Sequence, residues 1–278
     1  MGKLRSLMEE DLTLRGMSDH TKYCYLKRVA LFAKHFNKNP EQMGRTEVKE
    51  YLLYLIRNGS SRSTVNVSRA AIKYLYVDVL GRENELCHLP QMKSPHILPD
   101  VLDKDEIESI FKVIKNIKHL ALFMLIYSGG LRISEASRLL ISDIDSKKMV
   151  IRIRQGKQRK DRYTLLSDTA LRKLREYWKM YQPKHFLFSG QKEDSSISMK
   201  SIHRAFKTNV AKAKIDKQVS VHTLRHSFAT HLLDAKVSLV HIQKLLGHNS
   251  IKTTSKYLHI SHQALSEVTS PLDTLFDK

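Results

Sequence analysis

The sequence predicts a mainly α-helical protein with one small antiparallel β-sheet, divided into two domains. Apolar residues recur at helical spacing in most segments, and one short stretch alternates isoleucine with arginine. Between these regions Pro90, Pro95 and Pro99 fall within ten residues. Because proline breaks helices and favours extended chain, this stretch predicts a linker. We therefore expect an N-terminal domain at 1–89, a linker at 90–102 and a C-terminal domain at 103–278.

The N-terminal domain is predicted to be a bundle of four short amphipathic helices. Serine and threonine cap the first free N–H groups of a helix, whereas glycine adopts the left-handed conformation that ends one. The exposed faces of the bundle carry Arg62, Arg69 and Lys73. Taken singly, each is more simply explained as an ordinary solvated charge than as a DNA contact. The predicted helix starts are Ser18, Thr46 and either Ser61 or Ser63, and the predicted ends are Gly16, Gly59 and Gly81.

The C-terminal domain combines helices with a hairpin. HLALFMLIYSGG predicts a buried helix that ends at Gly129-Gly130, and ISEASRLL predicts a short helix after it. Ile151 and Ile153 alternate with arginine before the turn GKQRKD and the return strand YTL, which predicts a hairpin with a basic tip. Further helices are predicted at 170–180, 201–214, 223–235, 239–247 and around 253–261.

The charge of the chain indicates which kind of partner it binds. A net charge of +20 and a pI near 9.9 indicate a polyanionic partner such as nucleic acid, because neutralised phosphates release counterions. A merely basic soluble protein is the alternative. Cys24 and Cys87 are too few for a disulfide framework and lack neighbours at zinc-ligand spacing. Without an apolar signal or a membrane-spanning stretch, the chain is expected to be cytoplasmic.

The stretch HTLRHSFATH, at 222–231, admits three interpretations: a metal site, an ordinary polar helix or a phosphate-binding site. A zinc protease would have glutamate where Thr223 stands, so a metal site is disfavoured. With Thr223 as N-cap, His222 and Arg225 would lie at a helix start, where free N–H groups attract an anion. His226 and His231 are then interpreted as structural or solvent-exposed. An HxxR pair alone is a weak signal.

Three further positions carry possible chemistry. Arg132 follows a glycine pair that would let its guanidinium enter a cleft, His248 follows Gly247 at a helix end, and Tyr257 lies nine residues later. Taken singly, each has an ordinary structural explanation. In their order and spacing, however, GLRISEASRL, the Gly-Lys turn, HTLRHSFATHLL, LLGHNS and TTSKYLHI together resemble the tyrosine recombinases, or phage integrases. The chain is most similar to compact Xer-like or integron-like members.

The resemblance implies an N-terminal SAM-like DNA-binding bundle, a tyrosine-recombinase catalytic domain, and a role for each motif residue. Tyr257 would be the nucleophile, which needs activation because the pKa of a phenol is about 10. Arg132 and Arg225 would bind the non-bridging phosphate oxygens, and His248 would add a hydrogen bond. His222 would accept the tyrosine proton.

The Gly-Lys turn implies a general acid. Lys157 would protonate the leaving 5′ oxygen, with Lys160 as the competing lysine. Glu135 would position the active-site arginines rather than touch DNA. The resemblance implies no metal and no nucleotide cofactor, since a 3′-phosphotyrosyl bond conserves the energy of the broken phosphodiester.

The partners implied are double-stranded DNA with paired core sites and three further copies of the chain, which together pass through a Holliday junction. Segment 262–278 would dock on the next protomer through Leu272 and Phe276. The resemblance leaves open whether the protein needs an accessory directionality protein or a partner recombinase. It implies that the protein is nucleoid-associated. A type IB topoisomerase and a catalytically silent DNA-binding regulator are the alternatives. Candidate DNA contacts are Arg62, Arg69, Lys73 and Lys160.

Overall fold

The chain divides into two compact units, Met1–His96 and Ile97–Lys278. Each unit encloses its own hydrophobic core. In the described part of the chain, no helix is both long and apolar enough to cross a membrane. The computed structural model describes residues 2–82, 89–92, 100–154, 161–192 and 194–259.

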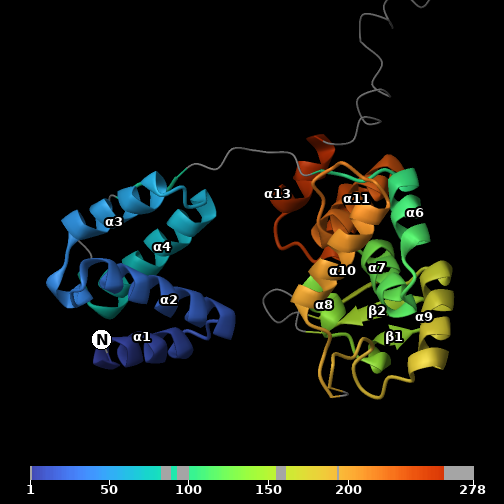
Figure 1. The fold of residues 1–278 in the computed structure, drawn as a ribbon, viewed down its shortest axis with the longest axis horizontal. Coiled ribbons are helices and arrows are strands. Elements are labelled where there is room, and N and C mark those ends of the chain that lie inside the picture. Colours follow the sequence, from blue (N-terminus) through green and yellow to red (C-terminus); the bar gives the residue numbers. More distant parts are fainter. Residues whose placement is uncertain (1, 83–88, 93–99, 155–160, 193, 260–278) are drawn as a thin grey trace, which may run out of the picture. The chain divides into compact units, whose positions relative to one another are not determined.

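The N-terminal unit is the predicted helical bundle (Figure 1). Ser18 and Ser61 cap the second and fourth helices, each accepting a backbone N–H three residues later at 3.2 Å. The predicted start at Thr46 is two residues late, because Gly44 is the N-cap and its N–H donates to Glu47 at 2.9 Å. The elements are α1 (Gly2–Leu14), α2 (Asp19–Phe36), a 3₁₀ turn (Pro40–Gln42), α3 (Arg45–Arg57), α4 (Arg62–Tyr74) and a π-helical turn (Leu75–Val79).

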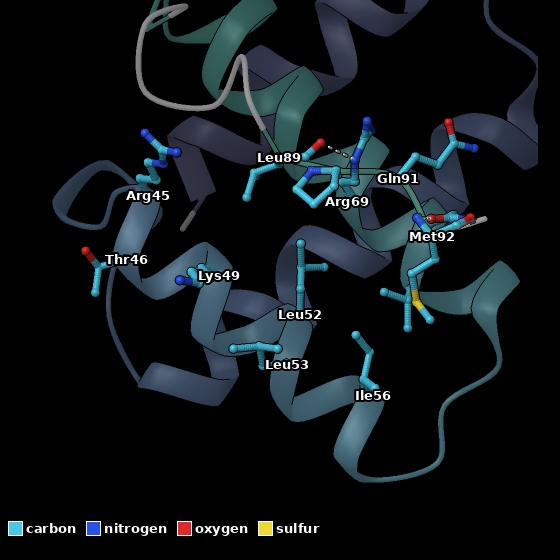
Figure 2. A pocket seen from close by; sticks show the side chains of 13 residues that line it. Arg45, Thr46, Lys49, Leu52, Leu53, Ile56, Arg69, Leu89, Gln91 and Met92 are labelled. Atoms are coloured by element: carbon cyan, nitrogen blue, oxygen red, sulfur yellow. Dashed lines mark hydrogen bonds between the residues drawn. The ribbon is translucent and has the colours of Figure 1, made fainter.

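Residues 89–92 lie along α4 and are held there by side chains of that helix. The amide of Asn66 makes two hydrogen bonds of 3.0 Å with the backbone of Met92, and Arg69 Nε donates to the carbonyl of Leu89 at 3.0 Å (Figure 2). Together with α3 these residues border a groove of about 790 Å³ whose floor is apolar. The first residues of the predicted linker are therefore fixed to the bundle.

The C-terminal unit is helical around one small sheet (Figure 1). The central helix α7 is buried and packs against α9 and α11, as its apolar sequence predicts. Asp103 caps α6, because Glu106 accepts its N–H at 2.8 Å. The helices are α6 (Lys104–Val113), α7 (Ile117–Gly129), α8 (Ile133–Ser137), a 3₁₀ turn (Ile141–Asp143), α9 (Asp168–Tyr181), α10 (Met199–Lys212), α11 (Val221–Asp234), α12 (Leu239–Leu246), α13 (Ile251–Thr254) and a final 3₁₀ turn (Ser255–His259).

The sheet has strand order β1-β2-β3, with both pairs antiparallel. β2 and β3 form the predicted hairpin, with Ile151 opposite Thr164 and Ile153 opposite Arg162. Both isoleucines are buried and Arg152 is exposed, as strand alternation requires. The two-residue strand β1 extends the hairpin on its other side. The strands are β1 (Ile144–Asp145), β2 (Val150–Ile153) and β3 (Arg162–Leu165).

Candidate active site

A glycine turn presents the first arginine. Gly130 caps α7 with φ +59°, a conformation that favours glycine, and a Cβ there would lie 2.4 Å from the ring of Phe228. The chain therefore reverses tightly and places Arg132 at the start of α8. Arg132 Nη2 donates to the carbonyl of Gly247, 3.3 Å away, so two distant segments meet at this side chain.

The carboxylate of Glu135 lies at the centre of an arginine cluster and is only 7% exposed. It accepts hydrogen bonds from the side chain of Arg132 at 2.7 Å and from both terminal nitrogens of Arg162 at 2.8 Å. Arg225 Nη1 is 3.7 Å away. Burial alone would raise the pKa of Glu135, but these arginines lower it to about 2. One anion thus balances three cations, leaving a net positive site.

Arg225 projects from α11 and is 4% exposed. Its guanidinium donates to the carbonyls of Gly130 at 2.7 Å and Leu246 at 2.6 Å, at the ends of α7 and α12. Burial and the nearby Arg132 lower its pKa to about 9, against the opposing effect of Glu135. It therefore remains charged at neutral pH. Two helix ends fix its orientation.

His248 follows the helix end at Gly247, which has φ +61°. Its Nε2 lies 3.1 Å from Arg225 Nη2, and its Nδ1 lies 2.9 Å from the hydroxyl of Thr254. Because a guanidinium can only donate, Nε2 must be the acceptor in this contact. Burial and the neighbouring arginines lower the pKa of His248 to about 3, in agreement with a neutral ring.

Tyr257 lies in the last 3₁₀ turn and is 3% exposed, packed against Phe228 and Leu246. Its hydroxyl lies 3.0 Å from Nδ1 of His226. Burial raises the pKa of Tyr257, while Arg225 and Arg132 oppose that rise. Burial and nearby cationic groups lower the pKa of His226 to about 4, so this ring is neutral at pH 7. A neutral imidazole beside the phenol can accept its proton.

The predicted start of α11 at Thr223 is wrong. The helix begins at Val221 with Ser220 as its N-cap, because the hydroxyl of Thr223 accepts the Ser220 N–H at 3.1 Å. Arg225 therefore lies more than a turn inside the helix, beyond the free N–H groups. The Tyr257 hydroxyl, whose proton we expected His222 to accept, lies beside His226, and the interpretation of His226 as structural or exposed missed this contact. The role of His222 in proton transfer stays a prediction.

The remaining histidines are dispersed. His222 is exposed as a whole residue, and its ring centroid lies 6.5 Å from that of His203 on α10. Partial desolvation of the ring, together with His203, Arg225 and Arg132, lowers its pKa. His231 binds the hydroxyl of Tyr127 at 2.9 Å, which fits the predicted structural role. Among the described residues no three His, Cys, Asp or Glu side chains converge as metal ligands would.

The other predicted positions lie elsewhere. Lys157, Lys160 and the segment 262–278 fall outside the described residues. Arg62, Arg69 and Lys73 all lie on α4 of the N-terminal unit, with Arg62 exposed. Arg162 was not predicted, although an arginine that shares the inward side of β3 with buried Thr164 signals a buried partner.

Comparison with known proteins identifies the family. The model of the phage integrase family matches residues 100–264, and that of the phage integrase N-terminal SAM-like domain matches residues 4–86. The chain belongs to the phage integrase family. It is a tyrosine-type site-specific recombinase.

Named relatives span most of this recombinase. The integrase/recombinase y4qK of Sinorhizobium fredii is 38% identical over 277 residues, covering 99% of this chain and 90% of the relative. The tyrosine recombinase XerA of Pyrococcus horikoshii is 32% identical over 259 residues, covering 92% and 88%. The similarity therefore extends through both units.

Solved structures of similar fold include complexes with DNA. XerH bound to palindromic difH substrate, in a post-cleavage complex, is 25% identical with a TM-score of 0.71, covering 91% of this chain and 79% of that one. A λ integrase dimer bound to a COC′ core site is 17% identical with a TM-score of 0.75, covering 91% and 96%, and supports the fold alone. The predicted fold class, a mainly helical recombinase with a small antiparallel sheet, is confirmed.

Proposed function

We propose that Tyr257 attacks a DNA backbone phosphate and forms a 3′-phosphotyrosyl bond. As the phenolic oxygen bonds to phosphorus, its proton passes to His226 and the bond from phosphorus to the 5′ oxygen breaks. The observation that carries this proposal is the 3.0 Å contact between the Tyr257 hydroxyl and a neutral His226, beside a cluster of arginines. A tyrosine placed only for packing needs neither neighbour.

We assign phosphate binding to Arg132 and Arg225, aided by His248. Two fixed guanidiniums match the non-bridging oxygens and stabilise the charge that accumulates in the transition state. Support comes from the contacts that hold Arg225 and His248 within 3.1 Å of each other. His222, exposed at the start of α11, is proposed as a further hydrogen-bond partner of the phosphate. Lys157 is proposed to protonate the leaving 5′ oxygen, with Lys160 as the alternative.

The residues present suit a reaction without a metal or a nucleotide. Arginine and lysine side chains supply the positive charge that divalent ions provide in many phosphoryl-transfer enzymes, and the neutral histidines add hydrogen bonds. The phosphotyrosyl bond keeps the energy of the phosphodiester, so that a 5′ hydroxyl of a second strand reseals the break through a Holliday junction.

We propose that the two domains share one duplex with paired core sites. Residues 1–89 would contact DNA through Arg62, Arg69 and Lys73 on α4, residues 90–102 would connect the domains, and 103–278 would catalyse. Four protomers would assemble on two duplexes in the cytoplasm, at the nucleoid. An accessory directionality factor or a partner recombinase is compatible with this scheme.

We propose that segment 262–278 docks on the next protomer. The catalytic unit offers an apolar groove of about 390 Å³ between α6, α7, α9 and α11, lined in part by Phe111, Met124 and Leu232. Leu272 and Phe276 would enter such a groove. Deleting 262–278 should weaken the synapsis of two sites in gel-shift assays while single-site binding persists; equal loss of both would contradict this role.

The catalytic proposal is tested with a nicked suicide duplex that carries the core site, incubated with protein in EDTA. Wild type should form a covalent protein–DNA band and Tyr257→Phe should lose it while still binding DNA. Tyr163→Phe, which changes an exposed tyrosine on β3, is the matched control and should keep the band. A band that survives in Tyr257→Phe would place the nucleophile elsewhere.

A topoisomerase would form the same covalent bond. Exchange between two marked core sites, measured as recombinant product, separates the two activities. Relaxation of supercoiled DNA without any exchange of partners would favour a topoisomerase. Specific binding with neither activity would favour a DNA-binding regulator.

A further inference from the structure

Arg162 makes several contacts within the site, but the catalytic proposal gives it no role. It begins β3, directly after the hairpin tip that carries Lys157 in the sequence. Although it belongs to a surface hairpin, its side chain is only 11% exposed. A long cationic side chain is seldom buried without dedicated partners.

The partners of Arg162 come from two separate segments. Its terminal nitrogens bind both oxygens of Glu135 at 2.8 Å, in the two-pronged geometry that makes an arginine–carboxylate pair strong. Its Nε donates to the carbonyl of Leu245 on α12 at 3.0 Å. One guanidinium thus joins the carboxylate that binds Arg132 to the helix that ends just before His248.

The turn before His248 is also shaped around Arg162. A Cβ added to Gly247 would lie 2.7 Å from Cδ and 2.9 Å from Nε of Arg162. Because real Cβ atoms essentially never approach this closely, a larger residue at position 247 would have to displace the Arg162 side chain. The backbone that leads into His248 therefore lies directly on Arg162.

Electrostatics give this arrangement a consequence for catalysis. Glu135 is shared among Arg162, Arg132 and, at 3.7 Å, Arg225. Without Arg162 the carboxylate would keep its charge but lose two hydrogen bonds. It would then attract Arg132 and Arg225 more strongly, in competition with a DNA phosphate.

We propose that Arg162 is a positioning residue: it occupies Glu135 and supports the turn of His248, so that Arg132 and Arg225 stay available to the phosphate. This inference rests on the proposed function of the same site. Arg162 itself does not contact DNA in this account, because each of its three guanidinium nitrogens already donates to Glu135 or Leu245.

The test compares single-turnover cleavage and DNA affinity for four proteins: wild type, Arg162→Ala, Arg162→Lys and the double variant Arg162→Ala/Glu135→Gln. Misplacing catalytic groups by about 1 Å costs about 10²-fold in rate, so Arg162→Ala should lose about that much at saturating DNA. Its affinity should fall much less than its rate, since Arg162 itself makes no phosphate contact and two arginines of one site supply only part of the DNA affinity. Arg162→Lys keeps the charge and should lose less.

The double variant distinguishes positioning from ordinary scaffolding. Removing the charge of Glu135 as well should recover about tenfold of the lost rate, because the unmatched anion no longer draws on Arg132 and Arg225. A purely structural role predicts the opposite, a double variant slower than either single one. Arg152→Ala is the matched control: this arginine lies on the same hairpin, pairs with Asp161 and is 45% exposed. Its cleavage rate should be unchanged.

The outcomes are separable. Wild-type-like cleavage by Arg162→Ala, or a loss of affinity equal to the loss of rate, would overturn the positioning role. So would a double variant without recovery. If Arg162→Ala unfolds at the assay temperature, Arg162→Lys replaces it in the comparison with wild type. A folded Arg162→Lys variant that cleaves at the wild-type rate would also contradict the proposal. If wild type forms no covalent complex that depends on Tyr257, the proposed function fails first.

Discussion

The two basic regions of this chain hold arginine in opposite ways. In the catalytic unit Arg225 is 4% exposed and is fixed by carbonyls at the ends of two helices. In the N-terminal unit Arg62 lies exposed in the first turn of α4. A fixed guanidinium loses no further freedom when the transition state forms, whereas an exposed one adapts to whichever phosphate is near. In the proposed function, burial rather than residue type separates catalytic charge from DNA-binding charge.

The largest expected effect comes from removing a fixed guanidinium. Arg225→Ala should lower the single-turnover cleavage rate by about 10³-fold, the range found for a single preorganised donor in an active site. Quench assays on the suicide duplex measure this rate. Arg175→Ala, an exposed arginine on α9, serves as the control and should cleave normally. If weaker DNA binding alone explained the lower cleavage rate of Arg225→Ala, the proposed difference between the two regions would be contradicted.

The histidine beside Tyr257 sharpens the comparison further. His226→Ala should slow cleavage by about 10²-fold, the usual contribution of a positioned proton acceptor. His231→Gln provides a control on the same helix, since His231 binds Tyr127 rather than Tyr257. If His222→Ala slows cleavage far more than His226→Ala, the proton acceptor is His222 and the contact in the structure is not the catalytic one.

Acid should weaken the catalytic unit through its buried histidines. The pKa of His226 is about 4 in the folded protein against 6.5 ordinarily, so its contribution to stability is complete above pH 6.5 and is lost as pH falls towards 4. By pH 5 this loss amounts to about 2 kcal/mol. Trp178, the only tryptophan of the chain, lies on α9 and reports the unfolding of this unit.

Urea midpoints by Trp178 fluorescence at pH 7.5 and pH 5 test this prediction. Wild type should lose more stability between the two pH values than His226→Gln, which has no group to titrate. Equal losses in both proteins would show that the folded structure does not depress the pKa of His226.

The smallest effect is expected on α4. Arg62→Ala should weaken DNA binding by less than about tenfold and reduce the slope of log K against log salt by about 1, as the loss of one phosphate contact requires. Titrations at several salt concentrations measure both quantities. Glu50→Ala, which changes an exposed residue of α3, is the control and should leave the slope unchanged. An unchanged slope in Arg62→Ala would remove Arg62 from the binding surface.

Local signals in the sequence predict most of the fold. Ser18 caps α2, Gly130 ends α7, and the Ile–Arg alternation forms β2, because each of these depends on a few neighbouring residues. The start of α11 was misplaced because Ser220 and Thr223 satisfy each other, which makes an earlier cap stronger than Thr223 alone. The two-residue strand β1 exists only through its pairing with β2.

The site was harder to predict where its contacts are distant in sequence. Spacing indicated Arg132, Arg225 and Tyr257, but the contact between His226 and Tyr257 joins residues 31 positions apart. Arg162 reaches Glu135 across 27 positions, through a sheet whose packing no local pattern specifies. Long-range packing therefore decides which of several polar residues in a motif meets the reacting group.

The central claim is that the arginines fixed by contacts in the catalytic unit serve the transition state, whereas the exposed arginines of the N-terminal unit serve affinity. The most direct test is the cleavage rate as a function of DNA concentration for Arg132→Lys and Arg62→Ala. We predict that Arg132→Lys lowers the maximal cleavage rate and leaves the half-saturating DNA concentration unchanged. Lysine keeps the charge but cannot bind two phosphate oxygens at once as a guanidinium does. Arg62→Ala should raise the half-saturating concentration and reach the wild-type plateau. Variants that shift both quantities together, in both regions, would contradict the account.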